Sequence, residues 1–153
     1  MSDVIMNIIL FALIMIPLLF LILRSSGKKE LQQFKSLMKN ENLNMGKYVI
    51  LTKQILCTDK TENALCYWVK GSQDFEKVLL AELESAEVMK SAHHGAVTES
   101  NIASLQKVEV YLTKKDKMHI ILPIYNINEN RPIDTDLLDV EGFIKNIKAL
   151  IKR

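Results

Sequence analysis

Apolar residues form one uninterrupted stretch near the start of the chain, from Val4 to Leu23. Its 20 residues carry no charge, and only Asn7 and Pro17 interrupt the apolar pattern. At about 1.5 Å per residue, a helix of this length spans roughly 30 Å, which matches the hydrocarbon core of a bilayer. The pattern therefore predicts a transmembrane helix over residues 4–23.

A cleaved signal peptide is the alternative interpretation of this stretch, because the small residues Ser25, Ser26 and Gly27 follow it. Such a peptide has a basic start, an apolar core of about 7–15 residues and a small-x-small cleavage site. This chain begins with Met-Ser-Asp, and its apolar stretch is longer than that core. The sequence therefore favours a retained helix.

The charges that flank the stretch predict its orientation. Arg24, Lys28 and Lys29 follow it, whereas Asp3 is the only charged side chain before it. Basic flanks stay on the cytoplasmic side of a membrane. The sequence thus predicts a single-pass protein of the plasma or inner membrane, with a short extracytoplasmic tail at 1–3 and a cytoplasmic C-terminal part.

A second helical pattern covers residues 28–39, inside a predicted basic juxtamembrane helix and linker at 24–46. The apolar residues that recur there at helical spacing are Leu31, Phe34, Leu37 and Met38. The basic residues, which are candidates for contact with the membrane surface, are Arg24, Lys28, Lys29, Lys35 and Lys39. In one interpretation these cations bind anionic headgroups, at about 1 kcal/mol each. In the other, the apolar stripe packs on the domain that follows.

Strand-like patterns fill the chain between residues 47 and 125. The predicted strands are 47–57, 64–70, 76–81, 83–90, 105–113 and 117–125. The first two flank a polar turn and form a predicted hairpin, which brings Cys57 and Cys66 near one another as small buried residues. Residues 91–104 have no clear pattern and are predicted to form a long loop.

The last pattern is an amphipathic helix over residues 136–152. Its apolar face consists of Leu137, Val140, Phe143, Ile144, Ile147, Leu150 and Ile151. Acidic residues gather at its start and lysines at its end, which complements the helix dipole. Glu141 and Lys145 are spaced to form an ion pair one turn apart.

Composition limits the classes of function. The chain has 153 residues and a net charge of +2, so it has no broad positive field to recruit nucleic acid. Its few arginines are Arg24, Arg131 and Arg153. Without the apolar stretch about 130 residues remain, which is the size of one domain.

The order of these elements resembles a pleckstrin-homology-like domain of the kind found in single-pass bacterial proteins. The resemblance covers roughly residues 47–152 and rests on antiparallel strands, the phrase LLAELESAEVMK and a closing helix. It implies an α+β fold, with a cytosolic domain at 47–153 in which a bent sheet or partial barrel is closed by the helix. Phe143 would occupy the inward aromatic position. The turn at 58–63 lacks the cluster of Lys and Arg that lipid-binding members carry.

No catalytic or metal-binding motif is present in the sequence. His93 and His94 lie in the predicted loop near Glu99, and His119 stands alone in a predicted strand. A metal site needs three or four ligands at defined spacing, which these residues do not supply. We therefore expect no enzyme activity, no cofactor and no metal.

The function that fits these features is a membrane-anchored protein-interaction module, serving as a small accessory or assembly subunit of a membrane protein complex. Its expected partners are the bilayer and other membrane or cytosolic proteins, but no nucleic acid. One alternative is a peripheral sensor of anionic lipid that acts through the basic segment. Another is a small membrane-anchored enzyme that uses the 91–104 loop.

Overall fold

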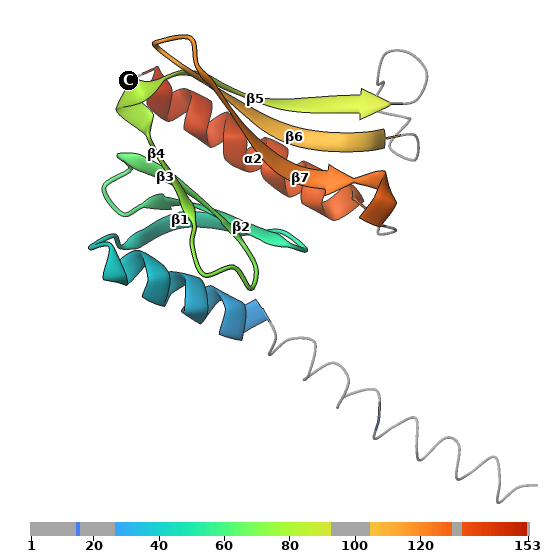
Figure 1. Ribbon diagram of the computed structural model, residues 1–153, viewed down its shortest axis with the longest axis horizontal. Coiled ribbons are helices and arrows are strands. Elements are labelled where there is room, and N and C mark those ends of the chain that lie inside the picture. The colour runs from blue at the N-terminus through green and yellow to red at the C-terminus, as the bar shows by residue number, and fades with distance from the viewer. Residues whose placement is uncertain (1–14, 16–26, 93–104, 130–132, 153) are drawn as a thin grey trace, which may run out of the picture.

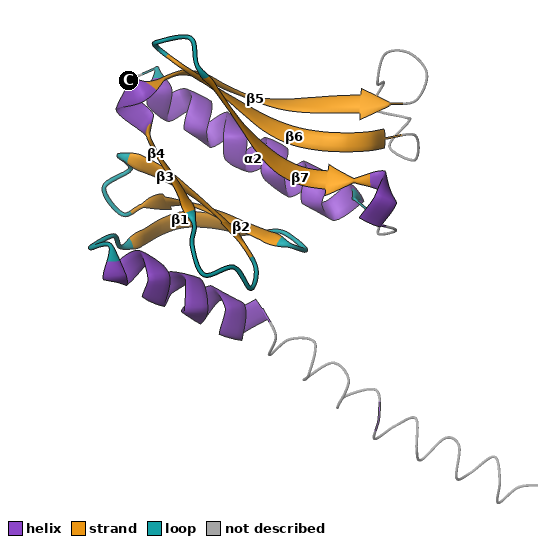
Figure 2. Ribbon diagram, viewed as in Figure 1, coloured by secondary structure: helices purple, strands orange, loops and turns teal. Residues whose placement is uncertain are grey.

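Two antiparallel sheets and a long C-terminal helix make up the domain (Figures 1 and 2). The computed structural model describes residues 15, 27–92, 105–129 and 133–152. After a helix over residues 27–40, the elements are β1 (Met45–Ile50), β2 (Gln54–Asp59), β3 (Ala64–Val69), β4 (Glu76–Leu79), η1 (Leu80–Glu82), β5 (Leu83–Ala92), β6 (Leu105–Lys114), β7 (His119–Asn126), η3 (Ile127–Glu129) and α2 (Asp134–Ile151). The α+β class predicted from the sequence agrees with this arrangement.

Each sheet follows the order of the chain. The first has the strand order β1-β2-β3-β4 and the second β5-β6-β7, and every pairing is antiparallel. The short η1 turn connects the two sheets, close to the break that the sequence predicts between its third and fourth strands. Figure 1 shows the sheets as two layers, with α2 alongside the second and the 27–40 helix below the first.

The predicted first strand, 47–57, is wrong in one respect, because the structure divides this run into β1 and β2. The chain turns at 51–53, where the Leu51 N–H donates to the Gln54 carbonyl over 2.9 Å. The Thr52 N–H donates to the two carboxylate oxygens of Asp136 in α2, at 3.0 and 3.1 Å. No Gly, Pro or Asn marks the turn, and the side chain that caps it comes from 84 positions away, so local pattern could not find it.

A first core, here called the inter-sheet core, fills the space between the sheets and α2. It includes Leu56 and Leu65 from the first sheet, Val110 and Leu122 from the second, and Phe143 from the helix. Alternate residues of β6 face it, as period-two patterning predicts. Phe143 is 7% exposed, which confirms the prediction that its ring is buried.

A second core, the helix-side core, lies on the opposite face of the first sheet. Its buried members are Phe34, Met38, Ile55, Cys57, Cys66 and Trp68. The rings of Phe34 and Trp68 stack with centroids 5.3 Å apart. The apolar stripe of the 27–40 helix thus packs on the domain, which is the second of the two interpretations given above.

The predicted membrane span is contradicted by the structure. Within the described ranges, no helix is long and apolar enough to cross a membrane. The helices that are described, 27–40 and α2, each present charged residues on one face and use the apolar face against a sheet. The prediction of a transmembrane helix over 4–23, the single-pass topology and the membrane localisation are therefore corrected. Apart from Met15, residues 4–23 lie outside the described residues, as does most of the predicted 91–104 loop.

Candidate functional site

A groove runs between β5 and α2 and is the candidate functional site. It contains two cavities, of about 180 and 280 Å³. The first is lined by Glu84, Ser85, Ala86, Glu87, Lys148, Ile151 and Lys152, and the second by Val88, Glu141, Ile144, Lys145 and Lys148. Lys148 borders both cavities, so they adjoin one another along α2 and are together called the β5–α2 groove.

The two walls of the groove run antiparallel. The start of β5 lies beside the end of α2, since Glu84 and Lys152 line the same cavity. Further along, Lys90 of β5 forms an ion pair with Glu141 of α2, which joins the walls at the other end. The sequence predicted that Glu141 pairs with Lys145 along the helix, but its observed partner is on the strand. This contact links α2 to β5.

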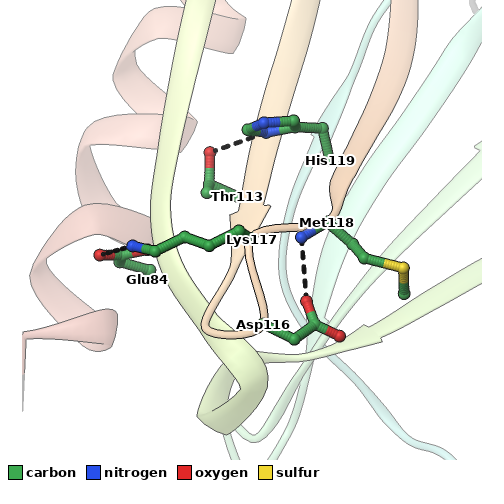
Figure 3. A network of polar contacts seen from close by, with 6 residues as sticks. All are labelled: Glu84, Thr113, Asp116, Lys117, Met118 and His119. Carbon is green, nitrogen blue, oxygen red and sulfur yellow. Dashed lines mark hydrogen bonds and ion pairs between the residues drawn. The ribbon is translucent and has the colours of Figure 1, made fainter.

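One carboxylate of the groove is neutralised from the β6–β7 turn. The Lys117 ammonium donates to both carboxylate oxygens of Glu84, at 2.8 and 2.7 Å, as Figure 3 shows. The turn itself is ordered by Asp116, whose side chain accepts from the Met118 N–H over 3.0 Å. Lys117 has a φ of 69° in this tight turn. From this turn the Lys117 side chain reaches Glu84 of β5 (Figure 3).

The helix wall of the groove is basic. Lys145, Lys148 and Lys152 are exposed and follow Glu141 along one stripe of α2. In the part of the chain that the structure describes, none of these three lysines is in an ion pair. The groove thus has unneutralised positive charge above an apolar floor that includes Ala86, Val88, Ile144 and Ile151.

The edge strands of the two sheets differ in their ability to accept another strand. β7 contains Pro123, which lacks an N–H donor and protects an edge. The Pro123 carbonyl accepts hydrogen bonds from the Tyr67 hydroxyl over 2.6 Å and from the Gln54 side-chain amide over 3.3 Å. β4 has 4 residues, and the β1–β2 pairing is irregular between Met45 and Tyr48. β5 has 10 residues and no proline, and among the described strands it pairs only with β6. That pairing is irregular at both ends of β5 and regular from Ser85 to Ser91.

The residues that the sequence proposed for membrane contact lie elsewhere. Lys28, Lys29, Lys35 and Lys39 are exposed on the 27–40 helix, while Arg24 lies outside the described residues. They do not line the β5–α2 groove, which sequence reasoning missed. The lysine stripe of α2 was visible in the sequence. That β5 is the strand facing these lysines is known only from the tertiary fold.

The two cysteines are paired across the strands but are not a reactive site. Cys57 of β2 lies opposite Cys66 of β3, and both are free and buried. Hydrogen bonding to Cys66 and burial both raise the pKa of the Cys57 thiol. Since the thiolate is the reactive form, burial and the raised pKa both disfavour reaction of this thiol. The prediction that both are small buried residues is confirmed.

The histidines give no metal site within the described residues. His93 and His94 lie outside these residues, and His119 is exposed with its Nδ1 3.3 Å from the Thr113 hydroxyl (Figure 3). Over 27–92, 105–129 and 133–152, no group of three or more His, Cys, Asp or Glu is placed to hold a metal ion.

Comparison of the chain with known proteins adds no relative. No protein-family model, no curated protein and no solved structure matches it. The case for a function therefore rests on the geometry of the chain.

Proposed function

We propose that this chain is a non-enzymatic protein-binding module, which holds an extended segment of a partner protein along β5 in the β5–α2 groove. In this mode an added strand forms main-chain hydrogen bonds with a free sheet edge, and adjacent cavities accept its alternate side chains. The segment would pair beside β5, with its side chains placed at the two cavities between β5 and α2.

The observation that carries the proposal is the contrast between β5 and the other edges. Proteins protect exposed edges with proline, short strands or irregular pairing. β7, β4 and β1 each have one of these features. β5 has no proline, and its pairing with β6 is irregular only at its two ends, so Ser85–Ser91 form a regular edge without proline. β5 also borders both cavities of the groove, so main-chain pairing and side-chain recognition are available at one place.

The order of elements supports the related proposal that the fold is pleckstrin-homology-like. Four strands, then three, then a helix that contacts β5 and β1 agree with the arrangement that the sequence resembles. Phe143 of that helix is buried in the inter-sheet core, as an inward aromatic residue of the closing helix would be. The fold alone does not give a function, so the edge and its groove remain the basis of the proposal.

Selection of random peptides by the full chain, followed by amide hydrogen exchange, tests the function. A selected peptide should slow exchange of β5 amides, because the free edge becomes hydrogen-bonded, and leave β4 and β7 unchanged. Ser85→Trp, which fills the cavity of about 180 Å³, should abolish binding. Ser91→Trp is the matched control, since Ser91 is exposed on the same strand and lines neither cavity. Failure to select any peptide that protects β5 would contradict the proposal.

A further inference from the structure

We infer that the segment bound in the β5–α2 groove is acidic, with carboxylates at alternate positions along an extended chain. This inference rests on the proposed function and specifies the chemistry of the partner. It depends on the charged side chains of the groove that have no ion-pair partner within the described part of the chain, and on the spacing of the lysines among them.

Most carboxylates that line the groove form ion pairs with lysines that do not belong to α2. Glu84 is bound by Lys117 from the β6–β7 turn, and Glu141 is paired with Lys90. In the described structure, Glu87 is the remaining groove carboxylate without an ion pair. Three lysines against one carboxylate leave the groove positive, which complements an acidic partner.

The spacing of the lysines fits an added strand. Lys145 and Lys148 are separated by about 4.5 Å along the helix axis, and Lys148 and Lys152 by about 6 Å. Residues two apart in a strand face the same side and are about 6.6 Å apart. Lysine side chains are long enough to absorb the remaining difference. Carboxylates at positions i and i+2 of the segment would therefore each meet one ammonium group of α2.

These lysines also complement the negative end of the α2 dipole, which is a structural explanation for their presence. That explanation requires only positive charge near the last turn of the helix and does not predict that any ligand binds there. A binding measurement separates the two explanations, because a dipole contribution changes the stability of the domain and leaves the preference for acidic peptides unaltered.

The test measures the affinity of selected peptides for the full chain and for the double variant Lys145→Gln/Lys148→Gln. We expect selected peptides to be enriched in Glu or Asp at alternate positions. Loss of two partly exposed ion pairs should weaken binding roughly tenfold, and added salt should reduce the difference. The control is Lys35→Gln/Lys39→Gln, which removes the same charge from the 27–40 helix and should leave affinity within about twofold.

The outcomes distinguish this inference from the function on which it rests. Peptides that protect β5 but carry no alternate carboxylates, or that bind the double variant and the parent equally, would overturn the acidic preference and leave the binding groove intact. Absence of any β5-protecting peptide would overturn both. Circular dichroism melting of the double variant confirms that it is folded, because both lysines are exposed and their replacement leaves the cores unchanged.

Discussion

At the scale of single residues, Asp59 at the end of β2 organises the β2–β3 turn. Its buried carboxylate accepts hydrogen bonds from the N–H groups of Asn63 and Ala64, at 2.7 and 2.8 Å, and from the Thr61 hydroxyl. Burial alone would raise the pKa of this carboxyl. The hydrogen bonds outweigh burial, so the pKa of Asp59 is lowered below its usual value. Folding therefore favours the ionised form of the Asp59 carboxyl.

Because the folded-state pKa is lowered, the contribution of Asp59 is fully present above the unfolded pKa of about 3.9 and is lost as pH falls through the folded pKa. Asp59→Ala should lower the free energy of unfolding at pH 7 by about 1.5–3 kcal/mol, since it removes charge-assisted hydrogen bonds. Urea titrations at pH 7 and pH 3 check this, and the difference between parent and variant should shrink at pH 3. Exposed Asp74→Ala is the control; an equal effect there would contradict the assigned role.

At the scale of elements, α2 is held to the domain by its buried stripe. Phe143→Ala should reduce the free energy of unfolding by about 3–5 kcal/mol, because it removes a large buried ring and leaves a cavity. Asn146→Ala, at an exposed position of the same helix, should change it by less than about 0.5 kcal/mol. Thermal or urea denaturation of both variants measures the difference. An unchanged midpoint for Phe143→Ala would mean that α2 is not required for the fold.

Elements with regular patterning were predictable, whereas those shaped by distant contacts were not. The alternation of β6 and the apolar stripe of α2 place both elements within a few residues of their observed bounds. The β1–β2 turn was missed, because Thr52 is held by Asp136 from the other end of the chain. The β5–α2 groove was missed for the same reason. Its lysines were evident in the sequence, but the facing strand and the Lys90–Glu141 pair are products of the fold.

At the scale of the whole molecule, the domain has a core on each side of its first sheet. The helix-side core requires the 27–40 helix, since Phe34 and Met38 cover Trp68. A fragment of residues 42–153 should therefore be less stable than residues 27–153 by about 3–6 kcal/mol, from the exposure of two or three large side chains. Denaturation curves of the two fragments measure the difference. Tryptophan fluorescence of the shorter fragment should shift to longer wavelength, and an unshifted spectrum would contradict the covering role of the helix.

The strand β2 belongs to both cores at once, because every one of its residues is buried. Leu56 points into the inter-sheet core, while Ile55 and Cys57 point into the helix-side core. Loss of order on one side removes a wall from the other, so we expect the two cores to unfold in a single transition. Trp68, the only tryptophan of the chain, lies in one of them. Its fluorescence is consequently a natural reporter for damage anywhere in the domain, including at α2 on the far side of the sheet.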